Sequence, residues 1–150
     1  MRALVSGEEV KRYEEPTTET FILFPYLAES GDVRLYSVEE MNRLFPAAWA
    51  YLKRHEKQLR ARERDAFNDD AWYRFGRNQN IGKQRRQKLL VPRLTKSLCV
   101  AVDATGSFCL DNVDVNGVLA DDDETVWFLA GVLNNPVSNL VGSGSMATAA

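Results

Sequence analysis

The order of short strand patterns and helix patterns is the feature that most constrains the fold of this chain. Strand patterns at residues 21–27 and 33–36 come first, helix patterns fill most of residues 37–64, and strand patterns return after residue 88. Consecutive strands without an intervening helix pair as hairpins, whereas a wound parallel sheet needs a crossover helix between its strands. The sequence therefore predicts an α+β fold, in which a small antiparallel or mixed sheet with hairpins packs against a few helices.

Two turn motifs join neighbouring strand patterns. The motif S-G-D at 30–32 lies between the first two strand patterns, and D-A-T-G at 103–106 lies between those at 98–102 and 107–110. Glycine and aspartate favour the tight turns of hairpins. We therefore expect two antiparallel hairpins, with residues 113–119 as a further short strand or an extended connector.

Helix boundaries are marked by capping residues and proline. Ser37 and Glu40 form a capping-box pattern, and the proline at the start of residues 46–64 fits the first turn of a second helix. A third helix is expected over residues 121–134, because its acidic start complements the helix dipole. Trp127 in this helix is expected to pack in the core.

Length and composition are those of one globular domain. With 150 residues, 45% hydrophobic and 27% charged, the chain can bury a core. We expect a domain at residues 1–140 and a disordered tail at 141–150. Because no apolar run approaches the roughly 20 residues that cross a bilayer, we expect a cytoplasmic protein without a membrane partner. Cys99 and Cys109 are then reduced buried thiols, and a disulfide across a hairpin is the alternative.

The charge is unevenly distributed along the chain. The net charge is only −2, but residues 53–96 hold 14 Lys and Arg against 5 Asp and Glu, while the remainder holds 5 against 16. Electrostatic steering depends on the local field, which physiological salt screens within about 8 Å. A basic middle between acidic ends can thus present one positive face, while a solvated helix surface explains most of the helical charges.

The basic middle is centred on residues 72–93, W-Y-R-F-G-R-N-Q-N-I-G-K-Q-R-R-Q-K-L-L-V-P-R. Lys and Arg bind phosphates, and Arg, Asn and Gln have the forked donors and acceptors that match base edges. Trp72 is expected in the core. The predicted phosphate contacts are Arg74, Arg77, Lys83, Arg85, Arg86, Lys88 and Arg93. The predicted base-reading residues are Asn78, Gln79, Asn80 and Gln84, with Arg77 as a candidate for a guanine.

The sequence lacks the patterns of catalysis and metal binding. The single histidine, His55, has no cysteine or carboxylate cluster at metal-ligand spacing around it. Gly76 and Gly82 do not form a phosphate loop between a strand and a helix, and the acidic residues 121–124 fit a helix start better than an ion site. We therefore predict a binding protein with no catalytic residue, metal site or cofactor of its own.

Seven motifs in one order resemble the C-terminal specificity, or target-recognition, domain of TaqI-like adenine-specific DNA methyltransferases. This class includes fused restriction–modification enzymes and phage-defence methylases. The motifs span roughly residues 4–140. They are LVSGEEVKRY (4–13), FILFPYL (21–27), YLKRHEKQLRAR (51–62), WYRFGRNQ (72–79), KLLVPR (88–93), VDATGSFCLD (102–111) and WFLAGVLNN (127–135).

The resemblance implies a module that reads double-stranded DNA and positions it for methylation by a catalytic domain in the same or a partner chain. That domain would bind S-adenosylmethionine and carry an Asn-Pro-Pro-Tyr-type motif, which N-N-P-V at 134–137 does not match. The chain is then a non-catalytic fragment or recognition subunit of such an enzyme, with or without restriction activity. Residues 72–79 and 88–93 correspond to parts of the family near the DNA.

Two other classes of partner stay open on the sequence. A protein–protein interaction module could use the same basic face to bind an acidic partner. RNA is a further alternative, although the basic run lacks the glycine-rich aromatic signatures of the common RNA-binding modules. Competition between duplex DNA, single-stranded DNA and RNA separates the nucleic-acid alternatives.

Overall fold

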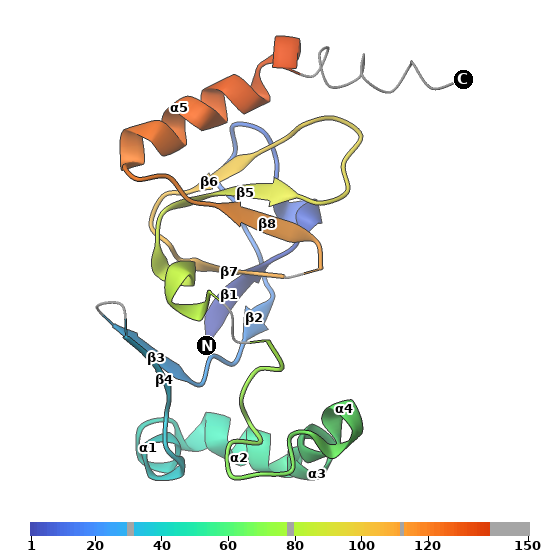
Figure 1. Ribbon diagram of the computed structural model, residues 1–150, viewed down its shortest axis with the longest axis vertical. Helices are drawn as coiled ribbons and strands as arrows, with labels where there is room; N and C mark the ends of the chain where they lie inside the picture. Colours follow the sequence, from blue (N-terminus) through green and yellow to red (C-terminus); the bar gives the residue numbers. More distant parts are fainter. Residues whose placement is uncertain (30–31, 78–79, 112, 139–150) are drawn as a thin grey trace. The chain divides into compact units, whose positions relative to one another are not determined.

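The computed structural model describes residues 1–29, 32–77, 80–111 and 113–138, and the chain divides into two compact units. Met1–Ile22 together with Gln84–Ala150 form the first, which we name the two-sheet unit, and Leu23–Lys83 form the second, which we name the helical unit. Helices and small sheets occur together, as the predicted α+β class requires (Figure 1).

The first sheet of the two-sheet unit has the strand order β2-β1-β7. Its strands are β1 (Arg2–Val5), β2 (Phe21–Ile22) and β7 (Phe108–Leu110). β1 pairs antiparallel with β2 and parallel with β7, with Ala3 opposite Phe108. The short 3-10 helix η1 (Gly7–Glu9) follows β1.

The second sheet has the order β6-β5-β8, and all of its pairs are antiparallel. Its strands are β5 (Lys88–Pro92), β6 (Ala101–Asp103) and β8 (Val115–Val118). The 3-10 helix η2 (Ile81–Arg85) precedes β5, and α5 (Asp123–Asn134) lies across this sheet (Figure 1).

The central strand β5 has hydrophobic clusters on both of its faces, because alternate residues of a strand face opposite sides. Leu90 is buried with Val5 and Val115 in a cluster that joins the two sheets. Leu89 is buried on the other face with Val126 and Ala130 of α5. β5 is therefore buried on both sides, which explains its continuous run of apolar residues.

The helical unit contains one hairpin and four short helices. The hairpin pairs β3 (Tyr26–Glu29) with β4 (Asp32–Leu35), with Ala28 opposite Val33. The helices are α1 (Val38–Leu44), α2 (Pro46–Arg54), α3 (Glu56–Arg60) and α4 (Arg62–Asp65). Trp49, Trp72 and Tyr73 form the centre of its buried cluster.

Several predictions of local structure are confirmed. Glu40 N donates to the Ser37 hydroxyl at 3.2 Å and Ser37 N donates to the Glu40 carboxylate at 2.8 Å, which completes the capping box. Pro46 occupies the first turn of α2. Trp72 is buried, and both cysteines are free thiols.

Three predicted elements differ from the structure. The turn at 103–106 joins β6 to β7, but these strands belong to different sheets, because β7 pairs with β1 instead. The predicted strand 21–27 is two strands, because β2 ends before Pro25 and β3 begins after it. The predicted helix 46–64 breaks at His55, which adopts a non-helical conformation, and again at Ala61.

Gly106 explains why the turn between β6 and β7 is so tight. Its φ is +65°, in the left-handed region that glycine adopts without steric cost. A Cβ at this position would collide with the backbone carbonyl of Arg85. The turn therefore depends on a residue without a side chain.

Candidate nucleic-acid interface

The predicted DNA-contact residues are divided between the two units. The helical unit holds Arg74, Arg77, Asn80 and Lys83, and the two-sheet unit holds Gln84, Arg85, Arg86, Lys88 and Arg93. Asn78 and Gln79 lie outside the described residues. Each set is described separately below.

Lys88 is the clearest correction to the predicted interface. Its side chain is only 2% exposed, and its Nζ lies 2.5 Å from Oδ2 of Asp103, which is also buried. The same ammonium donates to the Gln84 carbonyl at 2.7 Å. The prediction that Lys88 contacts phosphate is wrong, because its charge is already paired inside the protein.

The Lys88–Asp103 pair holds three elements of the two-sheet unit together. Oδ1 and Oδ2 of Asp103 accept from the backbone N–H groups of Ser107 (2.9 Å) and Phe108 (3.2 Å), beyond the β6–β7 turn. Burial lowers the pKa of Lys88, because desolvation disfavours its charged form, while the hydrogen bond to Asp103 acts in the opposite direction. The pair therefore links η2, β5 and the β6–β7 turn.

Arg74 and Gln84 are also engaged within the protein. Arg74 Nη1 lies 2.5 Å from Oδ1 of Asp69, and its guanidinium lies 4.6 Å from the centre of the Phe67 ring. The Gln84 side-chain oxygen accepts from the backbone N–H of Leu110 at 3.3 Å. Arg74 therefore has an ion-pair partner within its own loop, and the acceptor with which Gln84 would read a base is occupied.

The remaining candidates are exposed. Arg77 and Lys83 make no side-chain hydrogen bond or ion pair with any residue that the structure describes, and Arg86 donates to the Ala120 carbonyl at 3.3 Å. Asn80 is exposed with a φ of +59°, and its carbonyl accepts from Lys83 N at 3.0 Å at the start of η2. Arg85 and Arg93 are exposed as well.

The short helix η2 has one buried residue, Ile81, and exposed basic residues. Ile81 is buried, whereas Lys83 and Arg85 of the same short helix are exposed. The segment 77–86 also lies in an acid-free stretch, because the sequence contains no Asp or Glu between Asp70 and Asp103. Arg77 and Lys83 therefore have no acidic neighbour along this stretch of the chain.

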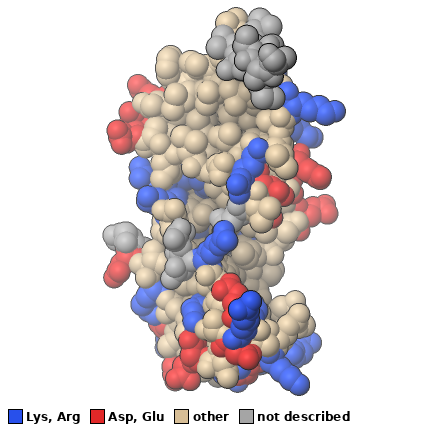
Figure 2. All heavy atoms as spheres, turned by 45° about the vertical axis from the view of Figure 1, so that its right-hand side comes forward, with Lys and Arg blue, Asp and Glu red and all other residues tan. Residues whose placement is uncertain are grey.

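Three cations of β4, α2 and α3 are arranged differently, because each has a carboxylate partner. Arg34 pairs with Glu40 at 2.6 Å, and Lys53 and Arg60 both pair with Glu56, at 3.1 and 2.7 Å. Figure 2 accordingly shows blue and red atoms next to each other over the helical unit. Lys53 and Arg60 are thus compensated by Glu56, and Arg43, Arg54 and Lys57 are exposed, as expected for a solvated helix surface.

Arg62 has a structural role that the sequence did not reveal. Its Nη2 donates to the carbonyls of Trp72 (2.9 Å) and Arg74 (3.0 Å), and its guanidinium lies 4.2 Å from the centre of the Phe67 ring. These partners lie 5 to 12 positions away along the chain, beyond the i+3 and i+4 spacing from which helix contacts are predicted. No sequence signal marks this contact.

Within the described part of the chain, no group of three His, Cys, Asp or Glu residues could hold a metal ion. The described helices include none that is long and apolar enough to span a bilayer. No protein-family model matches the chain, and no curated protein sequence matches it.

Proposed function

We propose that this protein binds double-stranded DNA through the segment 77–86, with Arg77, Lys83 and Arg86 on backbone phosphates. One observation carries the proposal: these exposed cations lie in a stretch of sequence without carboxylates, whereas Lys53 and Arg60 of the helices are both paired with Glu56. Unpaired Lys and Arg release counterions when they contact phosphates, and this release drives nucleic-acid affinity.

Asn80 and Arg77 are the residues that we propose for base recognition. An asparagine amide can form two hydrogen bonds with adenine, and an arginine can do the same with guanine. Asn80 lies at an exposed turn next to η2, whose backbone is anchored by Ile81. A side chain on such an anchored turn loses little freedom when it meets a base edge.

The order of the sequence motifs supports a finer proposal. We propose that the chain is the recognition module of an adenine-specific DNA methyltransferase of the cytoplasm, in modification alone or with restriction. The catalytic domain, with its S-adenosylmethionine, belongs to the same or a partner chain. The free thiols of Cys99 and Cys109 fit a reducing compartment.

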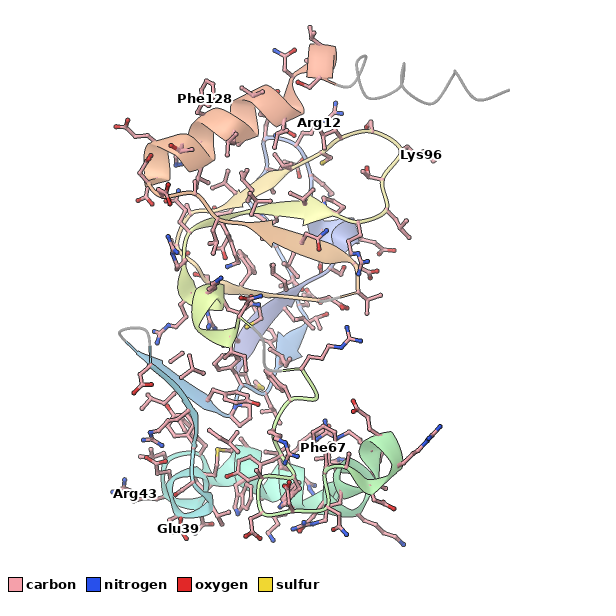
Figure 3. All side chains as sticks on the ribbon, in the orientation of Figure 1. Arg12, Glu39, Arg43, Phe67, Lys96 and Phe128 are labelled. Atoms are coloured by element: carbon pink, nitrogen blue, oxygen red, sulfur yellow. The ribbon has the colours of Figure 1, made fainter. Side chains whose placement is uncertain are left out.

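The first test measures binding of the full chain to a labelled duplex of random sequence. The variant Arg77→Ala/Lys83→Ala/Arg86→Ala should bind about 10-fold more weakly or worse, because three phosphate contacts are lost. The matched control is Arg43→Ala/Arg54→Ala/Lys57→Ala, which removes the same charge from exposed positions in α1, α2 and α3. Arg43 projects from the outer side of α1 (Figure 3). Equal losses in both variants would contradict the proposal.

Competition and selection experiments separate the partner classes. Unlabelled duplex DNA should displace the probe better than single-stranded DNA, RNA or polyglutamate; displacement by polyglutamate as strong as by duplex would favour an acidic protein partner. Selection of bound duplexes from the random pool should give a preferred base sequence. Arg77→Ala should change this preference at one base pair of the selected site. A uniform loss of affinity instead would place Arg77 on phosphate alone.

A further inference from the structure

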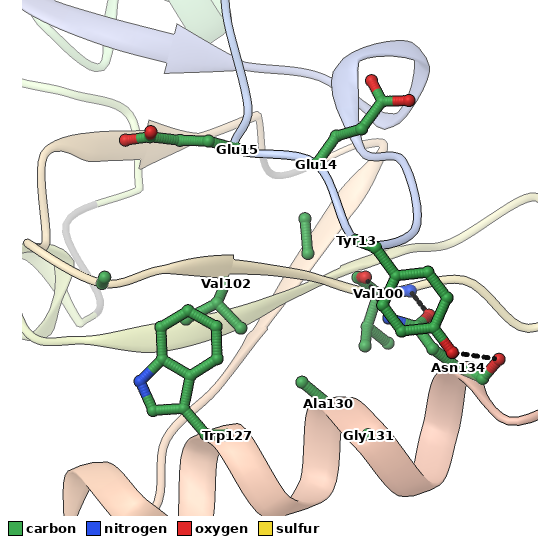
Figure 4. A pocket seen from close by; sticks show the side chains of 11 residues that line it. Tyr13, Glu14, Glu15, Val100, Val102, Trp127, Ala130, Gly131 and Asn134 are labelled. Atoms are coloured by element: carbon green, nitrogen blue, oxygen red, sulfur yellow. Dashed lines mark hydrogen bonds between the residues drawn. The ribbon is translucent and has the colours of Figure 1, made fainter.

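An open cleft of about 450 Å³ lies in the two-sheet unit, away from the segment 77–86 in sequence. One wall is formed by Trp127, Ala130 and Gly131 of α5, and the opposite wall by residues 13–15 (Figure 4). The floor is residues 100–102, in and just before β6. Its size is within the range of sites that hold small ligands or a few side chains.

The floor of the cleft is a free edge of a sheet. β6 is an outer strand of the order β6-β5-β8, and no described strand pairs with its other edge. The Asn134 amide donates to the Val100 carbonyl and accepts from Val100 N–H, both at 2.9 Å, so these backbone groups point away from β5. Because the hydrogen-bonding direction of a strand repeats every second residue, the N–H and C=O of Val102 also point into the cleft.

Trp127 forms an exposed aromatic wall of the cleft. The sequence assigns this residue to the core, but it is 56% exposed. Gln87 lies between the Asp123 carboxylate and the Trp127 indole N–H. When its amide oxygen faces the indole, that oxygen accepts from the indole N–H at 3.2 Å and the amide nitrogen donates to Asp123. In this orientation of the Gln87 amide the indole has a hydrogen-bond partner, so the ring loses less freedom when a ligand packs against it.

Residues 13–15 give the cleft a closed end and a negative rim. Tyr13 is held at a φ of +60°, and its hydroxyl donates to the Asn134 carbonyl at 3.2 Å (Figure 4). Glu14 and Glu15 follow and are exposed. Lys11 approaches Glu14 only to 3.9 Å, a distance at which an exposed pair contributes little, so both carboxylates are available to a cation.

We propose that this cleft binds a short extended segment of a partner protein, which adds as a strand to the free edge of β6. Its backbone exchanges hydrogen bonds with Val102, one of its apolar side chains packs against Trp127, and a Lys or Arg pairs with Glu14 or Glu15. Strand addition at a sheet edge gives main-chain affinity, and the neighbouring walls give side-chain specificity. The proposal does not depend on DNA binding, because it uses none of residues 77–86.

The test selects random linear peptides on the immobilised full chain, with counter-selection on the variant Gly131→Trp. A Cβ at Gly131 has no atom within 4 Å, so a side chain can start from this position, and an indole there would occupy the cleft that Gly131 lines. The matched control is Val132→Trp, at the next position of α5 and outside the cleft lining. Enriched peptides should alternate apolar residues, contain Lys or Arg, and bind Gly131→Trp at least about 10-fold more weakly than the wild type or Val132→Trp.

Backbone methylation distinguishes strand addition from side-chain binding. An enriched peptide is N-methylated either at its odd or at its even positions. One of the two peptides should lose binding and the other should bind as before, because only every second N–H group faces β6. Four outcomes overturn the proposal: no enrichment over Gly131→Trp, equal effects of methylation at odd and at even positions, enrichment of acidic peptides, or a dimer of the free chain that Gly131→Trp dissociates. The last outcome would assign the cleft to a second copy.

Discussion

Three ion-paired cations of the helical unit, Arg34, Lys53 and Arg60, and the exposed cations of the segment 77–86 are the same residue types in different electrostatic surroundings. In the helical unit, Arg34 of β4, Lys53 of α2 and Arg60 of α3 each lie within 3.1 Å of a carboxylate oxygen. In the segment, the nearest carboxylates in sequence are Asp70 and Asp103, and Asp103 is already paired with Lys88. The difference shows that the count of basic residues is a poor guide to a binding surface, because the position of the acids decides which charges are available.

The largest expected effect comes from Lys88, a lysine of the basic middle that is buried and paired with Asp103. Lys88→Ala should lower the free energy of unfolding of the two-sheet unit by about 3–5 kcal/mol, because it leaves Asp103 buried without its partner. Urea unfolding followed by circular dichroism measures this loss.

Lys96 provides the matched control for Lys88. It is an exposed lysine of the same unit and the same acid-free stretch, and Lys96→Ala should change the stability by less than about 0.5 kcal/mol. If the two variants had equal stability, the buried pair would not hold η2, β5 and the β6–β7 turn together.

A smaller effect is expected for Arg62, a cation of the helical unit whose guanidinium is hydrogen-bonded within the protein. Arg62→Ala should destabilise this unit by about 2 kcal/mol, because the carbonyls of Trp72 and Arg74 lose a charged donor. Fluorescence of the buried Trp49 and Trp72 follows the unfolding of the unit. At a temperature where the variant is folded, its DNA affinity should match that of the wild type. A loss of DNA affinity in the folded variant would place Arg62 at the interface.

The sequence predicted where helices and strands begin better than which strands pair with one another. Ser37 with Glu40, and Pro46, mark helix starts through local hydrogen bonding and backbone geometry, which act over one turn. The partner of β7 depends instead on β1, about one hundred positions earlier in the chain. Local turn chemistry at 103–106 predicts that the chain reverses, but it does not determine which sheet receives the strand.

The candidate site was predictable only in part for the same reason. Arg77 and Lys83 were identified as basic residues of a polar segment, and the structure leaves them exposed. The burial of Lys88 was not predictable from its neighbours, because its partner Asp103 lies 15 positions away on an adjacent strand. The exposure of Trp127 was likewise not predictable, since an apolar helix pattern does not show which of its residues the sheet covers.

The smallest expected effect is the pH dependence of a compensated helical pair. The guanidinium of Arg34 and the backbone N–H of Ser37 lower the pKa of Glu40 to about 2, from 4.5. Because the folded state holds its proton less tightly than the unfolded state, this stabilisation is present above about pH 4.5 and is lost as the pH falls towards about 2. Thermal unfolding of Glu40→Gln should therefore differ from the wild type near neutral pH and converge with it in acid. A gap that persists in acid would contradict the ionic origin.

The salt dependence of duplex DNA binding tests the central claim most directly. A plot of the logarithm of the binding constant against that of the salt concentration has a slope of about −0.9 for each phosphate contact. The slope should be about 2.7 less steep for Arg77→Ala/Lys83→Ala/Arg86→Ala than for the wild type, and unchanged for Arg43→Ala/Arg54→Ala/Lys57→Ala. Equal slopes for all three proteins would show that the exposed cations of segment 77–86 do not contact DNA.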